Sequence, residues 1–349
     1  MKTIYKLTLF FLLLPVGLSA SIVKGKYTKE KKIEKGFGVN SNAGLQVGNK
    51  FGNIAITTWD QDRTEIEVVI TVSGNNEDDV VKRLNSIDVE FDATKALVTA
   101  MTRFGNAKGK SSMEINYTIR IPKNGTLGIN NQYGSIKLGK IYGGMNIDLQ
   151  YGNIIIDEAN SEVNKLNLQY ANGSRIGYIK TMDLKMQYSD MNIVKSGAIT
   201  ANTDYSQIKV DEVRTISLDM DYGDLNVGYA NIINLKSDYS GFKCGRLDNL
   251  LNASVNYGNV KVNSITQWAR SIVVKGTYSE IKLGFAPETA FSFEFDTEYG
   301  GLGGKELLNF SEKTEKDIKA HYVGSSKAGE GNCKVYAKSE YGEIRISRN

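Results

Sequence analysis

A six-residue motif, Tyr-(Gly/Ser/Ala)-x-apolar-x-apolar, recurs throughout the second part of this 349-residue chain. Its apolar positions alternate with polar ones, which is the period of a β-strand and excludes a helical repeat. Tyr170 and Tyr299 head degraded copies, and successive tyrosines from Tyr133 to Tyr299 are 17 to 21 residues apart. Complete copies begin at Tyr133, Tyr151, Tyr188, Tyr205, Tyr222, Tyr239, Tyr257, Tyr278 and Tyr341.

Each period predicts one coil of β-structure, which we define as the segment from one motif tyrosine to the next. An apolar or small residue lies four positions before each tyrosine, as Ile129 does before Tyr133, so both are expected to point inward. The apolar residues after the tyrosine have the opposite parity. The side of the chain that points inward must therefore change at the Tyr-Gly step. No coil can bury its apolar face alone, and we expect parallel stacking at about 4.8 Å. The predicted fold class is all-β: a parallel β-solenoid (β-helix) with coils of about 17–21 residues.

An antiparallel meander is the alternative arrangement of such short strands. A meander embedded in a membrane needs an apolar outer face. Here the outward positions are mostly Asn, Gln, Lys and Asp. This polar outer surface favours the stacked parallel coils.

The chain begins like a secretory signal peptide over residues 1–20. Lys2 and Lys6 precede the apolar run Leu7–Leu14, and small residues up to Ala20 offer a cleavage site. The alternative is an N-terminal membrane anchor, but the run is too short to span a bilayer. We therefore expect an exported protein in the periplasm, at the cell surface or outside the cell, with no transmembrane segment in the mature chain.

Residues 21–125 follow a different pattern. They hold one isolated motif copy after Phe51, several longer alternating strands and a short helix expected over Glu77–Leu84. We expect an antiparallel β unit with one helix that caps the first coil, followed by the solenoid over residues 126–349. A charged insertion at 303–332 separates the last two motif copies and is expected to form a loop or hairpin over the open end.

These features resemble a bacterial family of exported β-strand-repeat proteins known as putative adhesins, a domain of unknown function. The resemblance rests on the tyrosine motif series, on Gly52-Asn53-Ile54-Ala55-Ile56 and on the strand Tyr117–Pro122. It covers nearly the whole mature chain and implies a β-repeat fold with an adhesive role. It implies no particular catalytic or binding residues, because the family has no agreed ones.

Charge and cysteine content narrow the possible partners. Without residues 1–20 the chain has 41 basic and 39 acidic residues, a balance that does not suggest nucleic acid as a partner. The two cysteines, Cys244 and Cys333, fall at apolar positions of predicted strands, so we expect buried free thiols. Two such distant cysteines do not make a disulfide framework.

The sequence contains no constellation typical of an enzyme or a cofactor site. His321 is the only histidine, and we expect it to be a solvated residue of the charged insertion. No phosphate-binding loop or zinc-like cysteine pattern is present. β-Helix enzymes that cleave polysaccharides need long loops around clustered acids, whereas the connections here are short. We therefore predict no enzyme and no cofactor.

The residue before each tyrosine forms an outward polar column. Stacked glutamines predict an amide ladder in the first coils, at Gln132, Gln150, Gln169 and Gln187. Stacked carboxylates follow and should repel one another, so we expect partial compensation by the basic column four residues after the tyrosine. The sharper hypothesis is a divalent cation site, such as one for Ca²⁺, at Asp204, Asp221 and Asp238.

The tyrosines themselves allow two interpretations. Strand parity favours an internal corner stack whose hydroxyls reach water, and the alternative is an exposed aromatic strip that binds glycans.

We predict a non-enzymatic exported adhesin or envelope scaffold that presents a polar surface to a protein or a glycan. The alternatives are a glycan-binding or glycan-cleaving β-helix protein and a periplasmic partner in envelope sensing.

Overall fold

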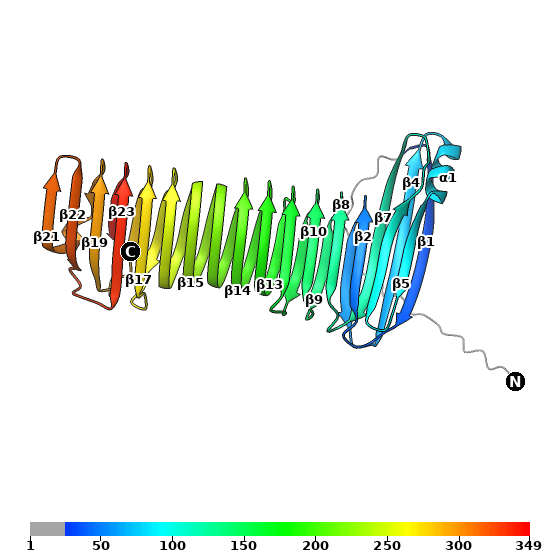
Figure 1. Cartoon of the computed structure of the whole chain (residues 1–349), viewed down its shortest axis with the longest axis horizontal. Helices are drawn as coiled ribbons and strands as arrows, with labels where there is room; N and C mark the ends of the chain where they lie inside the picture. Colours follow the sequence, from blue (N-terminus) through cyan, green and yellow to red (C-terminus); the bar gives the residue numbers. More distant parts are fainter. Residues whose placement is uncertain (1–24) are drawn as a thin grey trace.

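The computed structural model describes residues 25–349, so the expected signal peptide at residues 1–20 lies outside the described part. Within that part the chain forms 24 strands of one mixed sheet and a single α-helix, and the all-β prediction is confirmed. The molecule is an elongated stack with its strands side by side along the long axis (Figure 1). No helix within residues 25–349 is long and apolar enough to cross a membrane.

The N-terminal end contains the antiparallel part of the sheet. Here β1 (Tyr27–Gly38) and β7 (Ser111–Pro122) both pair with β4 (Arg63–Gly74), and β5 (Ile87–Ala93) pairs with β6 (Leu97–Phe104).

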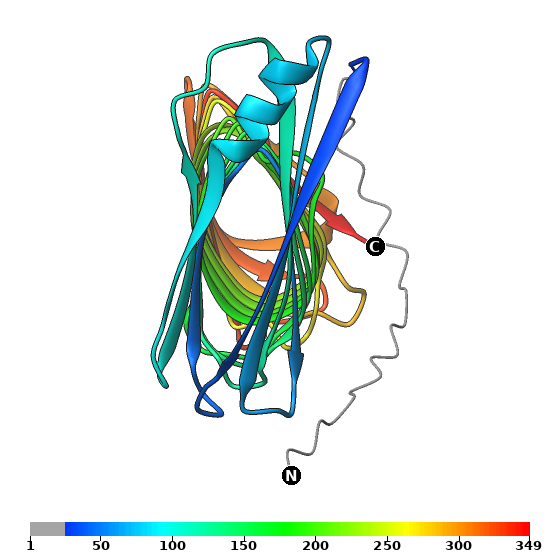
Figure 2. The same ribbon diagram turned by 90° about the vertical axis from the view of Figure 1, so that its right-hand side faces the viewer.

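The expected helix is present as α1 (Glu77–Asn85). The side chain of Asn76 caps it by accepting the backbone N–H of Asp79. Val80 is its fully buried residue. The helix lies over the N-terminal end of the stack, where it covers apolar surface that no further coil buries (Figure 2).

The motif copy after Phe51 is not isolated, because parallel pairing already begins there. Its strands β2 (Gly44–Lys50) and β3 (Ile54–Trp59) pair in parallel with β8 (Leu127–Gln132) and β9 (Ile136–Ile141). On their other side they pair, again in parallel, with β6 and β7. The region expected to form an antiparallel β unit therefore also contains a full parallel layer, and the pairing runs without a break past Gly125.

The regular part of the stack consists of parallel ladders offset by one motif period. Ile129 of β8 lies beside Ile147, which lies beside Leu166, which lies beside Leu184. Such offsets exclude the antiparallel meander for these residues. The strands are β10 (Met145–Gln150), β11 (Ile154–Ala159), β12 (Asn164–Gln169), β13 (Ser174–Gln187), β14 (Asp190–Asp204), β15 (Gln207–Asn256), β16 (Asn259–Ile265), β17 (Ser271–Thr277) and β18 (Glu280–Phe285).

The core runs along the axis of the stack and is lined by the residues that the motif spacing predicted. The residues four positions before the tyrosines are all at most 6% exposed, and so are the apolar residues three and five positions after them in the complete motif copies. Cys244 and Cys333 are buried free thiols, as expected. Burial raises the pKa of each thiol to about 12, so both are protonated at neutral pH.

The C-terminal end departs from sequence order. Strand β19 (Phe291–Glu298) does not pair with β17, because β23 (Cys333–Glu340) lies between them and pairs in parallel with both. Likewise β24 (Ile344–Arg348) lies between β18 and β20 (Leu302–Gly303). Figure 1 shows the red β23 between the yellow β17 and the orange β19. The coil of Tyr299, expected next after that of Tyr278, is thus displaced by one layer.

The charged insertion forms a hairpin that closes this end. After a short 3-10 turn at Lys305–Leu307, β21 (Leu308–Lys316) and β22 (Lys319–Ser326) pair with each other in antiparallel register. Strand β22 also pairs in antiparallel register with β19. The edge strand β21 carries several charged side chains, which disfavour pairing with another chain.

Candidate functional site: the tyrosine ladder and its groove

One aromatic ring from each layer contributes to a continuous column along the stack, which we call the tyrosine ladder. Neighbouring ring centroids are 4.5–5.3 Å apart and the ring planes are within 2–7° of parallel. Tyr341 stacks between Tyr278 and Tyr299, which confirms the displaced order of the last coils. The ladder consists of Phe51, Tyr133, Tyr151, Tyr170, Tyr188, Tyr205, Tyr222, Tyr239, Tyr257, Tyr278, Tyr341 and Tyr299.

The expectation that the tyrosines point inward is wrong, and the backbone explains why. Every ladder residue has a left-handed conformation, with φ between 47° and 61°. That conformation breaks the alternation of the strand, so a residue with inward parity turns outward at the corner. The tyrosine side chains are 43–51% exposed. Non-glycine residues rarely adopt this conformation, because it costs conformational free energy. The stacking of the rings between layers stabilises the corner and can offset this cost.

The stacking determines which part of each tyrosine can meet a ligand. Within the ladder each inner ring has its two faces covered by the rings of the adjacent coils. What remains open is a row of ring edges and hydroxyl groups. Sugar rings bind aromatic side chains through the ring face, so the ladder is poorly suited to glycan stacking. Any recognition along it depends on hydrogen bonds and edge contacts.

We expect Tyr222→Ala to lower the free energy of unfolding by roughly 1–3 kcal/mol, because the ring stacks on both Tyr205 and Tyr239. Tyr222→Phe keeps both contacts and should change stability by less than about 0.5 kcal/mol. Chemical denaturation of the two variants measures the difference. Equal losses in both would show that the hydroxyl, and not ring stacking, stabilises the corner.

The polar column before the tyrosines is partly as predicted. The Gln132 side-chain amide donates to Gln150, and that of Gln150 donates to Gln169, at 3.0 and 2.9 Å. Further along, Asn256 donates to Asp238 at 2.7 Å. The amide ladder is therefore confirmed over the first three glutamines.

The three aspartates lie in register on successive coils, with Asp204 directly beside Asp221. Desolvation, followed by the Asp238, Asp219 and Asp204 carboxylates, raises the pKa of Asp221. The proposed Ca²⁺ site at these aspartates stays a prediction.

The basic column does not compensate the aspartates in the expected way. Its members Lys209, Lys282 and Arg345 form ion pairs on their own strands. Their partners are Asp211 at 3.7 Å, Glu280 at 2.7 Å and Glu343 at 2.8 Å. The basic column lies on the other side of the corner from the aspartates. Its side chains therefore form ion pairs with acidic residues of their own strands and not with the aspartate column.

We expect Asp221→Asn to stabilise the protein at neutral pH by roughly 0.2–1 kcal/mol, the range for exposed charges. A carboxyl whose pKa is raised by folding stabilises the native state when protonated, and this contribution is lost as pH rises through the raised pKa. The advantage of the variant should therefore shrink as pH falls and vanish below about pH 3, where the aspartate is protonated in both states. Thermal melts across pH test this, and an advantage that persists at acidic pH would contradict it.

An open groove of about 570 Å³ lies beside the middle of the ladder. One wall is formed by Tyr188 and Tyr205, and the other by the polar residues two and four positions after the tyrosines. At one end Asn172 lines the groove from a bulge at Asn172-Gly173, where the degraded copy after Tyr170 has an inserted residue and Gly173 takes φ 77°. The lining polar side chains include Asn172, Asp190, Asn192, Gln207, Lys209 and Asn226.

The bulge is held to the coils on both sides by polar contacts. The Gly173 N–H donates to the carboxylate of Asp190 at 2.9 Å, and Ser174 Oγ accepts the N–H of Ile154. Ser174 thus fills the place of the missing apolar residue beside Met191. The donors and acceptors that line the groove are mainly side-chain amides, together with Lys209, which is shared with Asp211.

Comparison with known proteins places this architecture in a family. The family model described as Toastrack DUF4097 matches residues 45–347. The chain belongs to the Toastrack DUF4097 family. The match begins in β2, which agrees with the parallel pairing that already includes β2 and β3. A comparison with curated proteins finds no significant match.

Solved structures similar to this Toastrack chain are described as adhesion proteins. A putative adhesin from Parabacteroides merdae is 13% identical, with 74% of this chain and 93% of that chain covered and a TM-score of 0.35. A putative adhesin from Parabacteroides distasonis is 9% identical, with 93% and 99% covered and a TM-score of 0.33. A putative cell adhesion protein from Clostridium sporogenes is 11% identical, with 92% and 100% covered and a TM-score of 0.19.

No motif in the sequence indicates a cluster around His321. The residue was expected to be solvated, but it lies half-buried against Asp296, with Nδ1 2.7 Å from the carboxylate. Glu294 lies near both. The alternation of Glu294 and Asp296 on one strand face was visible in the sequence. The register that brings the hairpin histidine opposite them has no motif that predicts it.

Proposed function

We propose that this Toastrack chain is an exported, non-enzymatic β-solenoid that acts as an adhesin at the cell envelope. The observation that carries the proposal is the groove beside Tyr188 and Tyr205, an open polar recess on a long lateral face. Its shape suits an extended polar polymer that lies along the stack. The names of the similar solved structures are in line with this role.

The proposed organisation follows the strand pairing. A signal peptide over residues 1–20 directs export, residues 21–125 cap the stack and supply its first parallel layer, and residues 126–349 form the solenoid with its insertion at 303–332. The parallel offsets of one motif period support the solenoid. The hairpin paired with β19 supports a capping role for the insertion.

A glycan is the ligand class that the groove favours. Its walls offer side-chain amides, a carboxylate and a lysine, which together donate and accept hydrogen bonds as sugar hydroxyls do. The tyrosine edges exclude water on one side without offering a ring face. Binding should therefore depend on hydrogen bonds. The affinity for each sugar should be modest, and several simultaneous contacts along the axis should raise the overall affinity.

The test is binding of the purified, labelled chain to intact cells of the producing bacterium and to their extracted surface polysaccharide. Lys209→Glu, inside the groove, should weaken binding at least tenfold. Lys261→Glu is the matched control, because it occupies the same column outside the groove. Equal loss in both variants would point to general charge, and no loss in either would overturn the groove as the adhesive site.

Surface location requires its own experiment. Protease treatment of intact cells should cleave the chain if it is displayed outside. Protection from protease would contradict adhesion at the surface and favour a periplasmic partner role in envelope sensing. Polysaccharide incubated with the chain should show no new reducing ends and no unsaturated products, and their appearance would instead indicate a glycan-cleaving enzyme.

A further inference from the structure

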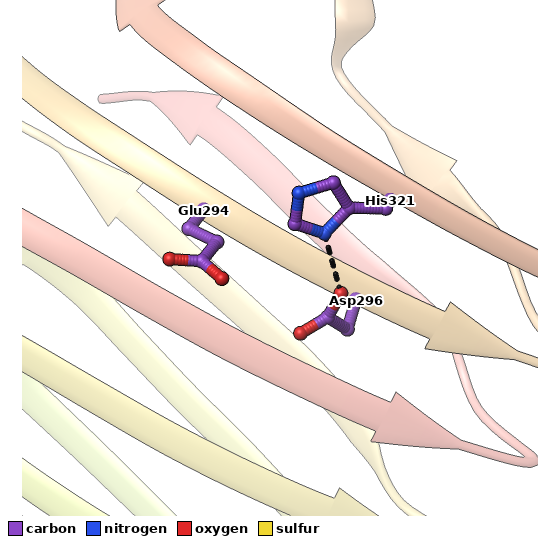
Figure 3. Close-up of side chains that lie close together, drawn as sticks. All are labelled: Glu294, Asp296 and His321. Atoms are coloured by element: carbon purple, nitrogen blue, oxygen red, sulfur yellow. Dashed lines mark hydrogen bonds and ion pairs between the residues drawn. The ribbon is translucent and has the colours of Figure 1, made fainter. Parts of the chain in front are cut away.

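The closing hairpin joins the stack through a cluster of potential metal ligands. Glu294 and Asp296 are two residues apart on β19, so both side chains lie on the same face of the strand. His321 of β22 lies directly opposite Asp296 in the antiparallel register. Figure 3 shows the three side chains converging above the sheet. One ligand atom from each lies within 4.8 Å of the others.

We propose that Glu294, Asp296 and His321 form a binding site for a divalent transition-metal ion such as Zn²⁺. Imidazole nitrogen and carboxylate oxygen are the ligands that such ions accept, at distances near 2.0–2.2 Å. Ligand atoms that already lie within 4.8 Å of one another need only small side-chain rotations to surround an ion. Three protein ligands leave a further position for water.

The surroundings of the cluster support a metal site. The Tyr336 hydroxyl of β23 donates to the second oxygen of Asp296 at 3.1 Å and so orients this carboxylate, as outer contacts do in metal sites. The nearby cation Lys338 is engaged by Glu340 at 2.6 Å. Two carboxylates therefore face the histidine, and their negative charge favours a cation.

Solvent access is sufficient for an ion to enter. The His321 and Asp296 side chains are 35% and 32% exposed. An open hollow of about 510 Å³, lined in part by both residues, lies beside them. The Asp296 hydrogen bond raises the pKa of His321, so protons compete with the metal. Binding should be measured at pH 7.5 or above for this reason.

The site would connect β19 with the hairpin strand β22. Glu294 and Asp296 belong to the last coil, whereas His321 belongs to the hairpin that covers it. A bound ion would therefore hold β22 on β19. This predicts that the metal slows amide exchange in β22 and leaves exchange in the middle of the stack unchanged.

The test is calorimetric titration of the full purified chain with ZnCl₂, together with visible absorption of Co²⁺ in the same site. We expect saturable binding of one ion per chain. His321→Asn, Asp296→Asn and Glu294→Gln should each weaken it at least tenfold. Glu298→Gln is the matched control, since this carboxylate lies on the same strand face and pairs with Lys319 instead.

Each outcome decides the proposal. The proposal is overturned if the unaltered chain shows no saturable binding, or if His321→Asn binds the metal as tightly as the unaltered chain. The cluster would then be an Asp–His hydrogen bond without a metal site. Unchanged melting of the metal-free variants checks that they fold. Binding without slower exchange in β22 would overturn the link between the ion and the hairpin. Loss of adhesion in the Lys209→Glu variant is independent of all these results.

Discussion

Deleting residues 333–349 is expected to unfold the C-terminal end of the stack while the coils before it remain folded. The deletion removes β23 and β24, the layer between β17 and β19. Three large aliphatic residues of the core leave with it, Val335, Ile344 and Ile346. At about 1.5–3 kcal/mol each, their burial alone amounts to roughly 5–9 kcal/mol. The surfaces exposed on both neighbouring layers add to this loss.

The effect should be local because each coil contacts mainly its neighbours. Without β23, the only strand left beside β19 among residues 25–332 is β22 of the hairpin. The apolar face of β19, which includes Phe293 and Phe295, then loses its neighbouring layer. A small set of antiparallel strands that cannot bury its apolar face is marginal in water. The middle coils keep both neighbours and should keep their stability.

Hydrogen exchange measured by mass spectrometry can separate the two regions. We expect β19, β21 and β22 to lose protection in the truncated chain, whereas β10 to β14 remain as protected as before. A chain that lacks only Asn349 keeps both terminal strands and serves as the control. If β19 stayed protected in the truncated chain, the intercalated layer would not be what holds it.

The terminal coils show where sequence reasoning fails. The motif spacing predicted the strands, their inward residues and their parallel pairing, because a period-two pattern repeated at a fixed interval leaves few other folds. Spacing along the chain carries no information about the order in which layers stack. Tyr341 carries the same motif as Tyr278, and nothing in either copy says that the coil of Tyr299 must lie outside both.

The prediction of the tyrosine orientation failed for a different reason. Parity arguments assume an extended backbone at every residue, and the ladder residues break that assumption at the corner. The small residue after each tyrosine was the available signal, since it marked a sharp turn. It did not say which residue of the turn takes the positive φ. The groove was also not predicted, because it depends on one inserted residue before Ser174.

The same corner yields the second large effect. Gly223 follows Tyr222, and a Cβ atom added to it would collide with the Ser206 carbonyl oxygen of the preceding coil. We expect Gly223→Val to destabilise the protein by at least about 3 kcal/mol, because a branched side chain would push the backbones of two closely packed coils apart. The midpoint of guanidinium unfolding measures this loss.

The sequence itself supplies the matched control. Serine occupies this motif position in other coils, and its hydroxyl bridges two layers. Ser206 Oγ donates to the Asp204 carbonyl and accepts the Ser189 N–H, at 2.8 and 3.2 Å. Gly223→Ser can form the equivalent bonds, which offset the displacement of the backbone, so its loss should be below about 1 kcal/mol.

Gly301→Val tests whether any valine in place of a motif-region glycine is harmful. No atom outside its immediate chain neighbours lies within 4 Å of a Cβ built there, so the substitution should be nearly neutral. If the valine at 223 cost less than about 1 kcal/mol, as is expected for the serine, close approach of the two backbones would not be the reason for glycine. The corner would then be selected for chain flexibility alone, and the hydroxyl bridges of the serine coils would be incidental to the stacking of layers.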